Sequence, residues 1–239
     1  SEQKKIGKPK RIPYGMMNFE HLRRDNCYFV DKTRFIEKIE DANKYFFFIR
    51  PRRFGKSLTL SMLAHYYDIN MKDSFDELFG DLYIGSHPTP ERNQYLILEM
   101  NFASIHADLE NYKEAMDAYC SRVFDLFCYK YRHLLPPDTS RKMEATHDAV
   151  GMLDLACNEC LKVGLPLYLL IDEYDHFTNK ILAEPDCFDK YRKETHGEGY
   201  IRKFYDVIKD GTNKSIERLF MTGVSPVTMD DLTSGFNIG

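Results

Sequence analysis

The sequence has no apolar run long enough to cross a bilayer. Its longest strongly apolar runs are residues 45–49 and 165–171. Both fall far short of the roughly 20 residues that a membrane-spanning helix needs. The residues that precede them also lack the pattern of a signal peptide. We therefore expect a soluble, cytoplasmic protein with no membrane partner.

An excess of positive charge is also missing. The 239 residues contain 33 lysines and arginines against 37 aspartates and glutamates. This balance argues against a protein that coats nucleic acid through a generally basic surface. Basic side chains gather only in residues 1–11, where five of them stand with a single glutamate. We expect these residues to form a flexible basic arm, and the alternative is an arm that contacts phosphates of nucleic acid.

Cysteine is sparse for a chain of this length. Six cysteines are scattered along the sequence, unlike the dense disulfide framework of a small secreted domain. We therefore expect reduced thiols. Cys157 and Cys160 form a C-x-x-C pair, but a structural zinc site needs four ligands and the sequence has no second such pair. Ordinary helix cysteines are the expected explanation.

The apolar residues that are present suffice for a sizeable core. Hydrophobic residues make up 43% of the chain and aromatic residues 14%, which excludes a disordered or collagen-like chain. At about 150 residues per domain, the length favours one large domain, residues 12–239. Residues 232–239 end without a helix cap or a polar tail. We expect the sequence to be a fragment that stops before the last strand and the lid of this domain.

Short apolar runs alternate with helical patterns along the chain. Strands are predicted at residues 45–49, 95–102, 165–171 and 216–222, and helices at residues 56–68, 109–135 and 147–162. This alternation favours a three-layer α/β fold with a mostly parallel sheet that helices cover on both faces. The polar residues 175–200 form the longest expected loop, and another helix, leading to Tyr205, is expected to open at residues 198–200.

The strongest chemical signal lies between the first predicted strand and the helix that follows it. Residues 50–57 (RPRRFGKS) match the second half of the pattern G-x-x-x-x-G-K-[ST], with Arg50 in place of the first glycine. Gly55 would let the backbone approach an anion, and the helix N-terminus would offer unpaired N–H groups. Lys56 could reach the β and γ phosphates of a nucleotide, and the Ser57 hydroxyl could ligate Mg²⁺. The predicted nucleotide-binding residues are Arg50, Pro51, Arg52, Arg53, Phe54, Gly55, Lys56, Ser57 and Leu58. The alternative is an ordinary helix N-terminus with an exposed lysine.

Two adjacent acids follow the apolar run 165–171, as in a Walker B motif. We predict that Asp172 assists Mg²⁺ together with Ser57, and that Glu173 is the catalytic base that orients the attacking water. Solvated acids at a strand end are the alternative. An adjacent Asp-Glu pair is typical of the NTPase division with an extra strand between the P-loop and Walker B strands. Residues 216–222 would supply that strand, and Thr222 or Ser225 would then lie beside the γ-phosphate as a catalytic sensor, together with Lys56.

Six short motifs carry a family resemblance. They are residues 12–15 (IPYG), 29–33 (FVDKT), 50–57 (RPRRFGKS), 171–175 (IDEYD), 222–226 (TGVSP) and 234–238 (SGFNI). In combination they resemble the predicted AAA-ATPase-like family over residues 12–238, and Arg50 in place of glycine is the usual form in that family. The resemblance implies a P-loop NTPase core of the additional-strand (AAA/STAND-like) type that binds ATP and Mg²⁺. Members often carry a C-terminal nuclease-like domain of the PD-(D/E)XK type, which is missing from this sequence.

Together these features predict an Mg²⁺-dependent, ATP-hydrolysing domain that acts as a nucleotide-driven switch for an attached domain or partner. One alternative is a non-hydrolysing, nucleotide-dependent scaffold for the nuclease-like domain. Another is a module that binds nucleic acid through residues 4–11 and the pair Arg52 and Arg53. Asp175 is expected either to support the site or to be a surface acid, and the sequence leaves the oligomeric state open.

Overall fold

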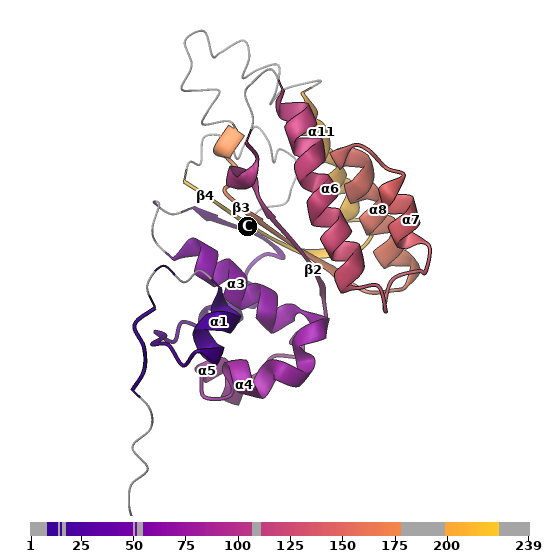
Figure 1. Cartoon of the computed structure of the whole chain (residues 1–239). Coiled ribbons are helices and arrows are strands. Elements are labelled where there is room, and N and C mark those ends of the chain that lie inside the picture. Colours follow the sequence, from indigo (N-terminus) through magenta and orange to yellow (C-terminus); the bar gives the residue numbers. More distant parts are fainter. Residues whose placement is uncertain are drawn as a thin grey trace, which may run out of the picture.

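A parallel sheet forms the middle layer of the protein, as a computed structural model shows (Figure 1). The structure describes residues 9–13, 15, 18–49, 51, 55–106, 111–177 and 199–224. Its strands are β1 (Tyr45–Ile49), β2 (Leu96–Asn101), β3 (Leu167–Asp172) and β4 (Ile216–Gly223). Every pair of neighbouring strands is parallel. The predicted α/β fold with a mostly parallel sheet is therefore confirmed.

The strand order is β1-β4-β3-β2, so the last described strand lies between β1 and β3. The register pairs Ile49 with Gly223 and Asn101 with Asp172. Because parallel strands end at the same edge of a sheet, the residues that follow β1, β3 and β4 come together there. This carboxyl edge of the sheet contains the motifs that the sequence singles out.

The N-terminal half of the chain covers one face of the sheet (Figure 1). Its helices are α1 (Phe19–Arg24), α2 (Phe35–Asp41), α3 (Lys56–Tyr67), α4 (Phe75–Phe79) and α5 (Tyr83–Ser86), with a 3-10 helix at Ile69–Ser74. Tyr168 and Phe220 of the sheet share a buried cluster with Leu63 of α3 and Phe79 of α4. Burying an apolar side chain of this size contributes about 2 kcal/mol, which fixes α3 against the sheet.

The opposite face carries α6 (Tyr112–Lys130), α7 (Thr139–Glu144), α8 (Ala149–Lys162) and α11 (Tyr200–Gly211). Leu169 and Met221 of the sheet share a second buried cluster with Phe124, Leu153 and Phe204 of these helices. The helix predicted at residues 109–135 is shorter, because the chain turns after Lys130, and residues 107–110 lie outside the described part. The helix expected to open at residues 198–200 is confirmed and begins at Tyr200.

Strand β1 and helix α6 differ in how far their aromatic residues are buried. The apolar run 45–49 predicts a strand buried on both faces, but all five residues of β1 are only partly buried. Both β1 and β2 are edge strands of the described sheet, yet the residues of β2 are mostly buried, so edge position alone does not account for this exposure. In contrast, the aromatic residues Tyr119, Phe124 and Phe127 of α6 are all buried and belong to the core.

The cysteines of the described ranges are all buried, and Cys120, Cys128, Cys157 and Cys160 are free thiols, in line with the sequence; Cys27 is the fifth buried cysteine. Within the same ranges, no group of three or more histidine, cysteine or acidic side chains could hold a metal ion. Cys187 lies outside them.

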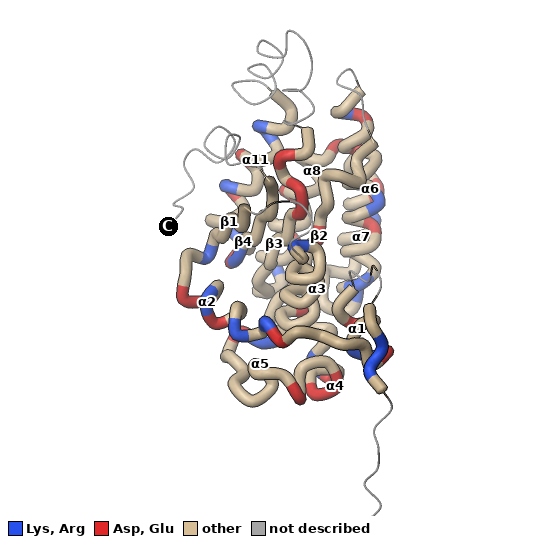
Figure 2. Tube along the Cα trace, turned by 90° about the vertical axis from the view of Figure 1, so that its left-hand side faces the viewer, with Lys and Arg blue, Asp and Glu red and all other residues tan. Residues whose placement is uncertain are grey.

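Charges of both signs are interspersed along the described trace (Figure 2). No helix in this part of the chain combines the length and the apolar character needed to cross a membrane. Residues 1–8 of the expected basic arm lie outside the described residues, so the arm stays a prediction.

Candidate functional site

Helix α3 begins at the carboxyl edge of the sheet, shortly after β1. Gly55 precedes its first residue and has φ 70° and ψ 20°, a left-handed conformation that glycine adopts without strain. A Cβ atom at position 55 would meet no atom within 4 Å. Glycine is therefore favoured here by the backbone conformation and not by a lack of room for a side chain. Thr59 N donates to the Gly55 carbonyl over 3.0 Å and starts the helix.

The flanking residues of this motif are described only in part. Pro51 is exposed and Leu58 is partly buried. Arg50, Arg52, Arg53 and Phe54 lie outside the described residues.

Lys56 is the first residue of α3 and is almost completely buried, with 7% of its surface exposed. Its Nζ donates to the Gly223 carbonyl at the end of β4 over 3.3 Å. The structure thus contradicts the alternative of an exposed lysine at an ordinary helix N-terminus. The ammonium group lies at the carboxyl edge, between α3 and β4.

Asp172 joins three elements at the same edge. Its Oδ2 accepts a hydrogen bond from Ser57 Oγ of α3 over 2.9 Å. Its Oδ1 accepts from Thr222 Oγ1 of β4, and also from Glu173 N over 2.9 Å. The aspartate is 7% exposed. A buried carboxylate must be hydrogen-bonded to avoid a large desolvation cost, and here every described donor is electrically neutral.

Thr222 is fully buried and its hydroxyl donates to Asp172. The sequence placed this hydroxyl beside a γ-phosphate, whereas the structure gives it a direct partner in the aspartate. Thr222 therefore holds the Asp172 carboxylate in this arrangement. Ser225, the other candidate for the sensor position, lies outside the described residues.

Glu173 differs from Asp172 in both backbone and exposure. Its φ is 50°, a left-handed conformation that costs energy for any residue other than glycine and often marks a functional site. About a third of its side chain is exposed, and its Oε2 lies 4.0 Å from Nδ1 of His176. The two adjacent acids are thus one buried carboxylate and one that water can reach.

The turn that follows Glu173 crosses the end of β4. Tyr174 N donates to the Thr222 carbonyl over 3.1 Å. Asp175 is 1% exposed, and its Oδ2 accepts a hydrogen bond from Val224 N over 3.0 Å. The interpretation of Asp175 as a surface acid is therefore wrong.

A cleft of about 380 Å³ opens beside Ser57 and Asp172, between α3 and β2. Glu99 and Asn101 of β2 line it as well. The Glu99 side chain is exposed to solvent at this cleft, unlike its apolar neighbours in β2. The sequence analysis missed Glu99, although an acid inside the apolar run 95–102 was a visible signal.

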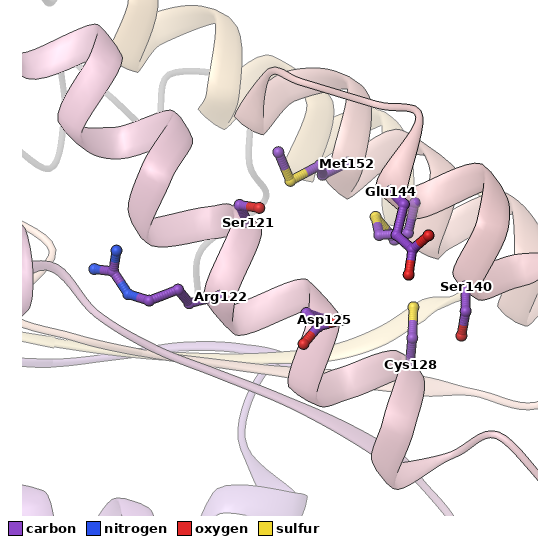
Figure 3. A pocket seen from close by; sticks show the side chains of 8 residues that line it. Ser121, Arg122, Asp125, Cys128, Ser140, Glu144 and Met152 are labelled. Carbon is purple, nitrogen blue, oxygen red and sulfur yellow. The ribbon is translucent and has the colours of Figure 1, made fainter.

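A second cleft, of about 180 Å³, lies among α6, α7 and α8 (Figure 3). Glu144 and Cys128 point toward one another across it. Burial raises the pKa of the Cys128 thiol to about 11, so this cysteine is protonated and unreactive at neutral pH. None of its lining residues belongs to the carboxyl-edge site, and the chemistry indicated by the sequence does not involve this cleft.

Comparisons with known proteins show the family of this chain. The family model described as predicted AAA-ATPase matches residues 13–233. A curated relative, an uncharacterized protein in the vnfD 5′ region of Azotobacter chroococcum mcd 1, is 28% identical over 229 residues. The match covers 95% of this chain but 40% of the relative, so the chain spans about two fifths of that protein's length. No solved structure matches. Because the family model covers nearly the whole sequence, this chain belongs to the predicted AAA-ATPase family.

Proposed function

We propose that this chain is an Mg²⁺-dependent ATP-binding domain that hydrolyses ATP. The carrying observation is the assembly of Lys56, Ser57 and Asp172 at the carboxyl edge of a parallel sheet, directly at the N-terminus of α3. A helix N-terminus combines free N–H groups with partial positive charge and so favours phosphate. Membership in a predicted AAA-ATPase family supports nucleotide binding.

Phosphate binding is assigned to the residues around Gly55. Lys56 binds the β and γ phosphates, because its ammonium group lies where the helix N–H groups begin. Gly55 lets the backbone of the loop come close to the phosphates. The rest of the proposed loop comprises Arg50, Pro51, Arg52, Arg53, Phe54 and Leu58.

Ser57 and Asp172 are the proposed holders of Mg²⁺. Their oxygens lie 2.9 Å apart, and a hydroxyl with a carboxylate is the hard oxygen set that Mg²⁺ prefers. The chemistry supplied by the bound ion is charge neutralisation at the phosphate oxygens. Thr222 keeps the Asp172 carboxylate turned toward Ser57.

Glu173 is the proposed general base. Its carboxylate follows the buried Asp172 directly and is partly exposed, so it can accept a proton from a water molecule near the phosphates. This accessible acid argues against the non-hydrolysing scaffold.

The position of β4 between β1 and β3 supports the additional-strand (AAA/STAND-like) division. We place one domain at residues 12–239 and an N-terminal arm at residues 1–11, in a cytoplasmic protein. The switch role, and the C-terminal nuclease-like domain that the switch would control, are proposals about a longer protein. The match covers only two fifths of the relative, which supports the proposal that this chain is part of a longer protein.

Titration calorimetry of ATP with Mg²⁺ tests phosphate binding. We expect Lys56→Ala to abolish ATP binding without loss of the fold. Lys44→Ala is the matched control, because Lys44 precedes β1 at the opposite edge of the sheet and 61% of its side chain is exposed. Unchanged ATP affinity in Lys56→Ala would contradict the proposal.

Phosphate release tests the proposed base. In Glu173→Gln we expect ATP binding to persist while phosphate release falls, because an amide cannot accept the proton. Release that continues at the wild-type rate would exclude Glu173 as the base. A wild type that binds ATP and releases no phosphate would favour the scaffold. Parallel measurements with GTP define the nucleotide preference.

A further inference from the structure

We propose that Asp175 is a positioning residue that holds Lys56 in place through the backbone at Gly223. This inference rests on the proposed function, in which Lys56 binds phosphate. It gives a role to an acid that lies outside the Walker B pair and faces the end of β4 instead.

The first link is the hydrogen bond between Asp175 and the backbone after β4. The carboxylate is almost completely buried, and its Oδ2 accepts from Val224 N over 3.0 Å. Taking a carboxylate out of water is costly unless strong hydrogen bonds compensate. The side chain is therefore held in a defined position, and with it the peptide group that joins Gly223 to Val224.

The second link is the close packing around Gly223. A Cβ atom at this position would lie 2.3 Å from Cε1 of Tyr174 and 3.0 Å from Oδ1 of Asp175. Tyr174 N also donates to the Thr222 carbonyl over 3.1 Å. The turn after β3 thus forms hydrogen bonds with the residues on both sides of Gly223. Because Gly223 has no side chain, the Tyr174 ring can pack against its backbone.

The third link leads to the lysine. The Gly223 carbonyl, which belongs to the same peptide group as Val224 N, accepts the hydrogen bond from Lys56 Nζ over 3.3 Å. One peptide group therefore receives Lys56 on its oxygen and bonds Asp175 through its nitrogen. Without the carboxylate this group can rotate, and the carbonyl then no longer holds the ammonium group at the helix N-terminus.

The first readout needs no nucleotide. Competitive acetylation with acetic anhydride, followed by mass spectrometry, reports how accessible Lys56 is relative to Lys44 in the same sample. We expect Asp175→Ala to increase the labelling of Lys56 while that of Lys44 stays constant. Asp175→Asn keeps an oxygen that can accept from Val224 N, and we expect it to restore the wild-type ratio.

The second readout is ATP affinity with Mg²⁺. We expect Asp175→Ala to weaken it about tenfold, which corresponds to about 1.4 kcal/mol, and Asp175→Asn to stay close to the wild type. The control is Asp68→Ala, which removes another buried carboxylate, one that hydrogen-bonds Tyr131 on the α6 side of the molecule. If Asp175→Ala does not fold, Asp175→Ser replaces it, because its shorter side chain cannot reach Val224 N.

Three outcomes would overturn the inference. The first is unchanged Lys56 labelling in a folded Asp175→Ala or Asp175→Ser variant, and the second is unchanged ATP affinity in that variant. The third is that Asp68→Ala changes the Lys56 labelling and the ATP affinity as much as Asp175→Ala does. A wild type without ATP affinity would contradict the proposed function instead, and the labelling ratio would still test the link from Asp175 to Lys56.

Discussion

The two ends of strand β4 both carry buried charged groups, but the partners of these groups differ in kind. Near the amino end, Arg218 is 5% exposed and makes two hydrogen bonds to Glu91, over 2.7 and 2.8 Å. At the carboxyl end, Thr222 and Ser57 direct their hydroxyls at Asp172. One end pairs a charge with an opposite charge, and the other surrounds a charge with neutral donors.

Under the proposed function, this difference distinguishes a structural ion pair from the nucleotide site. The Arg218 and Glu91 pair is electrically complete and needs no further ion. Asp172 is fixed by its donors, yet its negative charge remains uncancelled by any described side-chain bond. This uncancelled charge is the feature on which the proposed Mg²⁺ binding depends. The contrast predicts that substitutions at the amino end change stability, and that those at the carboxyl end change nucleotide binding.

The largest effect on stability is expected from Arg218→Met. The substitution leaves Glu91, whose side chain is 31% exposed, without its partner. Breaking a fully buried ion pair costs about 3 kcal/mol, and the partial exposure of Glu91 makes this figure the upper bound. ATP affinity should stay at the wild-type value. Urea denaturation and calorimetry measure the two quantities. Lys214→Met is the control, because this lysine pairs with Asp154 near the surface and such pairs contribute at most about 1 kcal/mol. A large loss of ATP affinity in a folded Arg218→Met would break the contrast between the two ends.

The cost of Arg218→Met should also depend on pH. Burial would raise the pKa of Glu91, but the hydrogen bonds from Arg218 and Tyr95 outweigh it and lower the pKa below its ordinary value of 4.5. A carboxyl group with a lowered pKa contributes stability at higher pH and loses it as the pH falls through the pKa of the folded state. The difference in unfolding free energy between wild type and Arg218→Met should therefore narrow below pH 4.5. Urea denaturation at pH 7 and in steps down to pH 3 checks this, and a constant difference would contradict it.

A smaller loss is expected from Thr222→Val at the carboxyl end. The substitution removes one donor from the buried Asp172, and such a loss costs about 1 to 2 kcal/mol. ATP affinity in the presence of Mg²⁺ should fall as well, because the carboxylate is then held by fewer bonds. Thr222→Ser keeps the hydroxyl and should recover most of the affinity. If the Thr222→Val and Thr222→Ser variants bind ATP equally well, the Thr222 hydroxyl has no role in placing Asp172.

Sequence patterns predicted the parts of this fold that local chemistry determines. The four strands appear within two residues of their expected bounds, because each is a short apolar run between turn signals. The adjacent Asp172 and Glu173 also predicted where β4 lies in the sheet, because this pair is typical of one strand order. Lys56, Ser57, Asp172 and Thr222 do meet at one edge.

Features that depend on tertiary contacts were missed. Helices α1, α2, α4 and α5 are four to seven residues long, and helices this short are stable only through packing. The burial of Asp175 had no local signal either. It arises because the left-handed turn at Glu173 carries a polar segment across the end of β4.

The smallest effect on stability, and the sharpest test of the comparison, is expected from Asp172→Asn. Asparagine keeps the size of the side chain and one acceptor oxygen, and a hydroxyl such as that of Ser57 can accept from the new amide. The free energy of unfolding should therefore change by less than about 1 kcal/mol. The negative charge is lost, however, so ATP affinity should no longer depend on Mg²⁺. Calorimetry with Mg²⁺ and with EDTA measures this dependence, and Asp154→Asn, a half-exposed aspartate paired with Lys214, should retain it. If Asp172→Asn responds to Mg²⁺ as the wild type does, the uncancelled charge at this end of β4 does not serve a metal ion.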